Sequence, residues 1–181
     1  MNLRFSAHVI RVICLALASA STAGCGFRLV GSDSLPPELK NVTVQPERGL
    51  QAAEPPVAVA LRQALARRGA AVETKADAGS AVIRLSRVSD YRETIALGTD
   101  GKALEYRLVQ SVAYDLRQNG IVLAGPDTVT VSRDYAFKIT QVLATEQEEQ
   151  ELRQYLQQQL ANLVLLHIAS RYAMVMQLSL I

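Results

Sequence analysis

The sequence predicts an α+β fold, a two-layer sandwich in which two helices cover one face of a four-stranded, mainly antiparallel sheet. Three observations favour it. Long runs between residues 81 and 137 alternate apolar and polar side chains, as in strands covered on one side. Two other segments have apolar residues at helical spacing. The elements follow the order β-α-β-β-β-α, and both helices need a common surface on which to bury their apolar faces.

The first 24 residues have the layout of a secretory signal peptide. Arg4 and Arg11 supply basic charge, and an apolar run covers 9–20. This run is shorter than the ~20 apolar residues that a membrane-spanning helix needs. The next stretch, TAGC at 22–25, resembles a bacterial lipobox, in which the signal is cut just before the cysteine and the thiol carries a diacylglycerol.

Cys25 is therefore expected to be a lipid anchor. Cys14 leaves with the leader, so Cys25 has no disulfide partner within the mature chain. Several acyl chains hold a protein firmly, because each buried CH₂ contributes about 0.8 kcal/mol. Gly26 follows where inner-membrane lipoproteins tend to carry Asp, which by analogy favours the outer membrane. We divide the chain into a signal peptide (1–24), a lipidated N-terminal linker (25–40) and one α+β domain (41–181).

A short strand and a helix are expected first in this domain. Val42 and Val44 share one face of the strand at 41–45. Pro56 suits the first turn of the helix that follows, and Gly69 suits its C-terminal cap. The apolar positions of this helix are Val57, Leu61, Ala64 and Leu65.

Three long strands are predicted next, over 81–97, 103–118 and 127–137. The pairs Asp100-Gly101 and Asn119-Gly120 indicate the turns between them. One face of the second strand is expected to contain Tyr106, Leu108, Gln110, Val112, Tyr114 and Leu116. One face of the third is expected to contain Val129, Val131, Arg133, Tyr135 and Phe137.

A long helix is predicted from about Thr145. Thr145 and Glu148 have the spacing of a capping box, and the acidic residues at 146–151 suit the positive end of the helix dipole. The apolar stripe of this helix is expected to follow Leu152, Leu156, Leu160, Leu163 and Leu166 or His167. The sequence does not decide whether the apolar tail AMVMQLSLI is a packed tail, a partner-binding strip or a frayed end.

Charge and residue inventory argue against several classes of function. After the leader is removed, 17 acidic and 17 basic residues remain, so no net field attracts nucleic acid. His167 is the one retained histidine, which argues against a His/Cys zinc site and a Ser-His-Asp triad. The sequence has no G-x-S-x-G, P-loop or G-x-G-x-x-G pattern. We expect no catalytic residue, no metal and no cofactor besides the covalent lipid on Cys25.

Several segments together resemble the LPS-assembly lipoprotein LptE family. They are TAGCGF running into RLVGSDSLPPELKNVTVQ, the helix LRQALARRGA, the hairpin DGKALEYRLVQSVAYDL, and RDYAF before a Glu/Gln-rich final helix. The resemblance covers nearly the whole mature chain. It implies an outer-membrane lipoprotein that plugs an LptD-type β-barrel, helps the barrel to assemble, and takes part in lipopolysaccharide insertion into the outer leaflet.

The resemblance also implies lipopolysaccharide contacts by basic residues at the hairpin tip and before the final helix. This chain has Thr99 and Thr145 there, and threonine cannot pair with phosphate as lysine or arginine does. A solvated surface role is the alternative for any basic residue nearby. The nearest replacements are Lys102 and Lys138, followed by Arg92 and Arg133.

Two other functions stay open at this point. A free-standing, periplasm-facing lipoprotein would bind a soluble ligand or act as a scaffold for a cell-wall enzyme. An enzyme is the third possibility, which the residue inventory disfavours. The partners implied by the leading hypothesis are the LptD-type barrel and lipopolysaccharide, at the periplasmic side of the outer membrane and in the barrel lumen.

Overall fold

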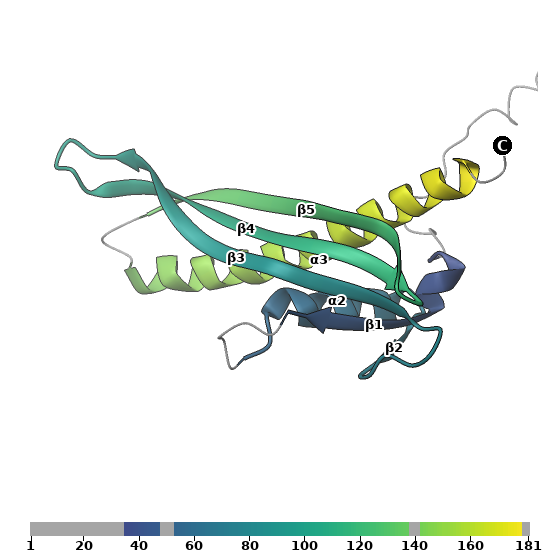
Figure 1. The fold of residues 1–181 in the computed structure, drawn as a ribbon. Coiled ribbons are helices and arrows are strands. Elements are labelled where there is room, and N and C mark those ends of the chain that lie inside the picture. Colours follow the sequence, from purple (N-terminus) through teal and green to yellow (C-terminus); the bar gives the residue numbers. More distant parts are fainter. Residues whose placement is uncertain (1–34, 48–52, 138–141, 179–181) are drawn as a thin grey trace, which may run out of the picture. The chain divides into compact units, whose positions relative to one another are not determined.

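The computed structural model describes residues 35–47, 53–137 and 142–178, which belong to one compact unit that begins at Leu35. One 3-10 helix, five strands and two α-helices follow one another in this unit (Figure 1). They are η2 (Pro37–Lys40), β1 (Asn41–Pro46), α2 (Pro56–Arg67), β2 (Ala71–Glu73), β3 (Ala81–Leu97), β4 (Ala103–Gln118), β5 (Ile121–Ala136) and α3 (Val142–Leu178). The α+β class is confirmed.

The sheet is mixed and has five strands in the order β2-β1-β3-β4-β5. β1 pairs in parallel with both β2 and β3, whereas β3, β4 and β5 form an antiparallel meander. The predicted count of four strands is wrong, because the three residues of β2 are too few to show an alternating pattern. Parallel strands need a crossover connection, and α2 supplies it between β1 and β2.

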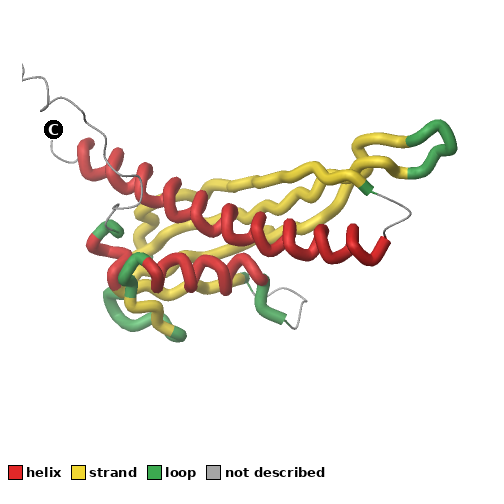
Figure 2. The backbone as a smooth tube through the Cα atoms, turned by 180° about the vertical axis from the view of Figure 1, so that it is seen from behind, coloured by secondary structure: helices red, strands yellow, loops and turns green. Residues whose placement is uncertain are grey.

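Both α-helices lie on the same face of the sheet (Figure 2). The core between the helices and the sheet is aliphatic. It contains Val42, Ile83, Leu116, Leu61 and Leu156, all fully or almost fully buried. In β4 the predicted apolar face is confirmed, because Leu108, Val112 and Tyr114 are buried. No helix covers the opposite face in the part of the chain that the structure describes.

The turns at both ends of β4 occur at the two predicted pairs. Asn119 and Gly120 have φ angles of +51° and +81°, as the two central residues of a type I′ hairpin require. At the other end, Gly101 N–H donates to the carbonyl of Gly98 over 3.0 Å. The β3–β4 hairpin continues past the end of β5, whose pairing with β4 stops at Glu105, and its tip is at one end of the unit (Figure 1).

A bulge in β3 changes which residues face the helices. The register with β4 shifts between Ser86 and Ser89, and Arg87 has a φ of +46°. Before the bulge, the buried side chains of Ile83 and Leu85 face the helices. After it, Asp90 and Arg92 pair with Gln110 and Leu108 of β4 and so take the helix side.

The start of α3 differs from the prediction. The helix begins at Val142, so Thr145 is buried within its first turns and cannot form the predicted capping box with Glu148. The predicted stripe holds through Leu156 and Leu160, but Leu166 is exposed and His167 only partly buried. α3 also packs against α2, and the buried residues in its second half are Ala161, Val164, Leu165 and Ile168.

The last residues of the predicted linker are folded. Pro37–Lys40 form η2, and the Leu39 side chain is completely buried in the core. Tyr172 of α3 donates a hydrogen bond to the Glu38 carboxylate, so η2 is also tied to the long helix. Met1–Ser34, with the predicted signal peptide and Cys25, lie outside the described residues.

Candidate functional site

Lys102 lies in the turn at the tip of the β3–β4 hairpin. Its Nζ is 3.2 Å from Asp100 Oδ2, and its backbone N–H donates to Asp100 Oδ1 over 3.2 Å. Both side chains are well exposed, so water screens the pair and its strength is small. Thr99 is exposed beside them. An anionic ligand could therefore bind Lys102 here after breaking only a weak ion pair.

Arg92, by contrast, is held on three sides at the base of the hairpin. Its Nη1 is 2.8 Å from Glu149 Oε2 and 3.5 Å from the Tyr135 hydroxyl, and its guanidinium lies 4.3 Å from the centre of the Tyr106 ring. The hydrogen bonds to Tyr135 and Glu149 raise the pKa of Arg92 above its ordinary value. These contacts hold the side chain against α3, so ligand binding would have to break them.

Arg133 is exposed on β5, and its guanidinium is 5.6 Å from the centre of the Tyr155 ring on α3. Within the described residues it has no ion-pair partner. Its charge is therefore available to an anion. Lys138, the remaining predicted cation, lies outside the described residues.

A polar network that the sequence analysis did not find joins the hairpin to α3. Arg153 forms ion pairs with Asp90 and with Glu149, the latter at 2.8 Å. Gln110, almost fully buried, donates to Asp90 Oδ2 over 3.0 Å and to the Arg153 carbonyl over 3.3 Å. The sequence signal was the polar Gln110 on an otherwise apolar face of β4.

Burial and hydrogen bonds within this network shift the pKa values of Glu149 and Tyr135. Burial would raise the pKa of Glu149, but hydrogen bonds from Tyr135, Arg153 and Arg92 hold it below its ordinary value. Burial, and then the hydrogen bond to Glu149, raise the pKa of Tyr135 to about 12. At neutral pH the network therefore holds a charged carboxylate and a neutral phenol, an arrangement that ties α3 to the sheet.

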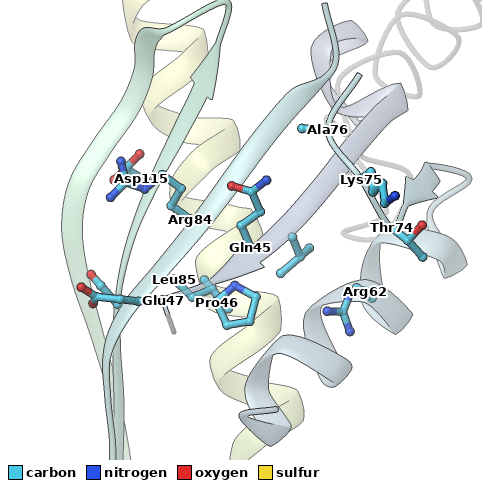
Figure 3. Close-up of a pocket in the computed structure, with 12 residues that line it drawn as sticks. Gln45, Pro46, Glu47, Arg62, Thr74, Lys75, Ala76, Arg84, Leu85 and Asp115 are labelled. Carbon is cyan, nitrogen blue, oxygen red and sulfur yellow. Dashed lines mark ion pairs between the residues drawn. The ribbon is translucent and has the colours of Figure 1, made fainter. Parts of the chain in front are cut away.

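A hollow of about 740 Å³ lies where β1 and β2 end, and Arg62 of α2 is among the residues that line it (Figure 3). Two of its basic side chains have acidic neighbours: Arg62 pairs with Glu54, and Arg84 is 4.0 Å from Asp115. Lys75 also lines it, and its carbonyl accepts a hydrogen bond from the Thr43 hydroxyl over 3.2 Å. Of the predicted ligand contacts that the structure describes, Lys102, Arg92 and Arg133 do not line this hollow.

His167, the one histidine of the described residues, lies on α3 near Asp127 and Ser170. Its Nδ1 is 4.0 Å from Asp127 Oδ2, but the nearby Ser170 hydroxyl donates to the His167 carbonyl and not to the imidazole. Among the described residues, no three His, Cys, Asp or Glu side chains are grouped to hold a metal ion. None of the helices in this part of the chain is long and apolar enough to cross a membrane.

Comparison with known proteins identifies the family. The family model described as "LptE: Lipopolysaccharide-assembly" matches residues 39–168. The LPS-assembly lipoprotein LptE of Photorhabdus laumondii subsp. laumondii is 30% identical over 157 residues, which cover 85% of this chain and 82% of that protein. The protein of the same name from Pectobacterium atrosepticum is 29% identical over 163 residues, with 85% and 82% covered.

Solved structures show the same fold. The solution structure of lipoprotein B from Nitrosomonas europaea superimposes with a TM-score of 0.65 at 25% identity and covers 80% of this chain and 91% of that one. Rare lipoprotein B from Shewanella oneidensis gives a TM-score of 0.61 at 22% identity, with 75% and 98% covered. The family consists of assembly lipoproteins and not of enzymes. By its matched residues and its relatives, this chain belongs to the LptE family of lipopolysaccharide-assembly lipoproteins.

Proposed function

We propose that this protein is an outer-membrane lipoprotein, anchored by an acylated Cys25, that plugs an LptD-type β-barrel and takes part in lipopolysaccharide insertion into the outer leaflet. Membership of the LptE family supports the lipopolysaccharide-assembly role. The plug role is more specific than membership of the family. Its support is the face of the sheet that the helices leave uncovered.

This uncovered face is mostly polar, with Tyr91 and Val109 paired among its polar side chains. Its middle carries hydroxyl groups, with Ser89 Oγ and Ser111 Oγ 2.8 Å apart and Thr130 paired beside Ser111 on β5. Near the hairpin, Arg107 lies 2.6 Å from Asp134. Side chains of these kinds are costly to bury without partners and are well solvated in water. A wide barrel encloses an aqueous lumen, in which such a face remains solvated or makes hydrogen bonds to a polar wall.

Lipopolysaccharide carries phosphates, and the basic residues near the hairpin are the proposed contacts. Lys102 and Arg133 are the first choices, because the pair of Lys102 with Asp100 is exposed and Arg133 has no ion pair in the described ranges. Lys138, two residues beyond β5, is the third. Arg92 has the weaker claim, since Glu149 and Tyr135 already occupy its guanidinium.

A mild-detergent pull-down of the C-terminally tagged full chain from outer membranes tests the plug role. Mass spectrometry is expected to find one large β-barrel protein in stoichiometric amount. Recovery of the lipoprotein alone would contradict the plug role and favour a free-standing binding module or scaffold. Cys25→Ala, measured in parallel, is expected to keep the fold and to leave the membrane fraction when no barrel is present.

A further inference from the structure

A group of exposed apolar side chains lies at the end of the unit far from the hairpin tip. Ile121 and Val122, the first two residues of β5, are 67% and 41% exposed, and Met174 on α3 is 57% exposed. Val122, Pro126 and Met174 line one hollow of about 310 Å³, and Ile121 is beside this hollow as the chain neighbour of Val122. Large apolar side chains that share a surface site in this way indicate a contact with another apolar surface.

The chain enters the folded unit at this same end. Tyr172, two residues before Met174 on α3, donates a hydrogen bond to Glu38 of η2. Leu39, buried in the core, fixes η2 from the other side. Both views of the backbone draw η2, the β4–β5 turn and the last turns of α3 at one end and the β3–β4 tip at the other (Figures 1 and 2).

The length of chain between the anchor and this end limits their separation. Cys25 and Leu35 are ten residues apart, and an extended chain spans at most about 3.6 Å per residue. The acyl chains therefore keep Leu35, two residues before η2, within about 36 Å of the bilayer surface. Tethering raises the effective concentration of the lipid surface at this end, so even weak apolar contacts become populated.

We propose that Ile121, Val122 and Met174 rest on the phospholipid leaflet that holds the acylated Cys25. The apolar side chains enter the boundary between headgroups and acyl chains, as interfacial elements do. Arg171, next to Met174 in space and 3.5 Å from Asp127, remains at the level of the headgroups. This inference depends on the proposed function only through the lipid anchor and not through the barrel or lipopolysaccharide.

The chain contains no tryptophan, so one introduced tryptophan reports on one position. Ile121→Trp and the matched control Leu97→Trp, at the exposed hairpin tip, are made in the full lipidated chain and reconstituted in phosphatidylethanolamine and phosphatidylglycerol vesicles. Mass spectrometry of the Cys25 peptide verifies the lipid first. The Ile121→Trp emission is expected to shift to the blue and to lose intensity when the acyl chains are brominated, whereas the Leu97→Trp emission does neither.

Equal quenching of both variants, or none at position 121, would overturn the inference. Met174→Trp repeats the measurement if Ile121→Trp misfolds, as judged by circular dichroism. A blue shift of Ile121→Trp that needs added barrel protein also overturns it, because the patch would then be a protein contact. An unlipidated Cys25 overturns the anchor and this inference together, while the pull-down of the barrel reports separately on the plug.

Discussion

Arg92 on β3 and Glu149 on α3 form an ion pair across the two layers, with 2.8 Å between Nη1 and Oε2. Glu149 also accepts hydrogen bonds from the Tyr135 hydroxyl and from Arg153. One carboxylate therefore joins β3, β5 and α3 at the base of the projecting hairpin. Arg92, a predicted ligand contact, is therefore already held by contacts within the protein.

Glu149→Gln should destabilise the fold. The amide keeps the shape of the side chain but removes the charge and puts N–H groups opposite the donors of Arg92 and Arg153. The expected loss is about 2 kcal/mol in the free energy of unfolding, because the side chain is largely buried and its charged partners stay behind. Urea denaturation measures it. Glu148→Gln, an exposed neighbour, is the control, and an equal loss there would contradict the assignment.

The same carboxylate should make stability depend on acid. The pKa of Glu149 is held below the ordinary value of 4.5 in the folded state, so the unfolded chain binds its proton at a higher pH. The stabilisation is therefore complete well above pH 4.5 and is lost as the pH falls through the folded pKa. In denaturation curves from pH 7 downward, the stability gap between wild type and Glu149→Gln should narrow below about pH 4.5. If the difference in the free energy of unfolding between wild type and Glu149→Gln stays constant over this pH range, Glu149 is not the source of the acid dependence.

The parts of this fold that could be predicted have a strong local signal. Strand β4 alternates over most of its length, and its faces follow directly from that pattern, with Leu108 and Val112 inward. The Asn119-Gly120 pair specifies its turn by backbone sterics alone. Lys102 is exposed beside the turn at the other end of β4, and its predicted ligand contact stays a prediction.

The errors occur where tertiary contacts override the local pattern. The bulge at Arg87 reverses the inward side of β3, and only pairing with β4 reveals it. It turns Arg92 toward α3 and Glu149, which no spacing rule predicts. Thr145 and Glu148 have a valid capping pattern, but the helix continues upstream to Val142 and buries the threonine.

Leu39→Ala should destabilise the protein by about 2–5 kcal/mol, because a completely buried leucine leaves a cavity. The same substitution in a flexible linker would leave the free energy of unfolding almost unchanged. Thermal or urea unfolding of the two proteins distinguishes these cases. Leu143→Ala is the matched control, since that leucine is 82% exposed and its loss should cost less than about 0.5 kcal/mol.

Gly125→Ala should cost more than Gly101→Ala. Both glycines have a left-handed φ, +84° and +76°, so both substitutions strain the backbone by about 1–2 kcal/mol. A Cβ on Gly125 would also lie 2.7 Å from the Tyr114 carbonyl oxygen, whereas a Cβ on Gly101 meets nothing within 4 Å. Strand β4 or β5 must shift to relieve this contact. Equal losses in the free energy of unfolding would contradict the close packing at Gly125.

The combined change Lys102→Glu and Arg133→Glu should weaken lipopolysaccharide binding by the purified protein. Each reversal replaces an attraction to phosphate by a repulsion, and exposed pairs contribute up to about 1 kcal/mol each, so a loss of about tenfold is expected. Binding of labelled lipopolysaccharide measures it at low salt, where screening is weakest. Lys40→Glu combined with Lys75→Glu, two exposed charge reversals away from the hairpin tip, gives the same change in net charge and is the control. If this control weakens binding as much, the attraction is general, and the hairpin is not the contact.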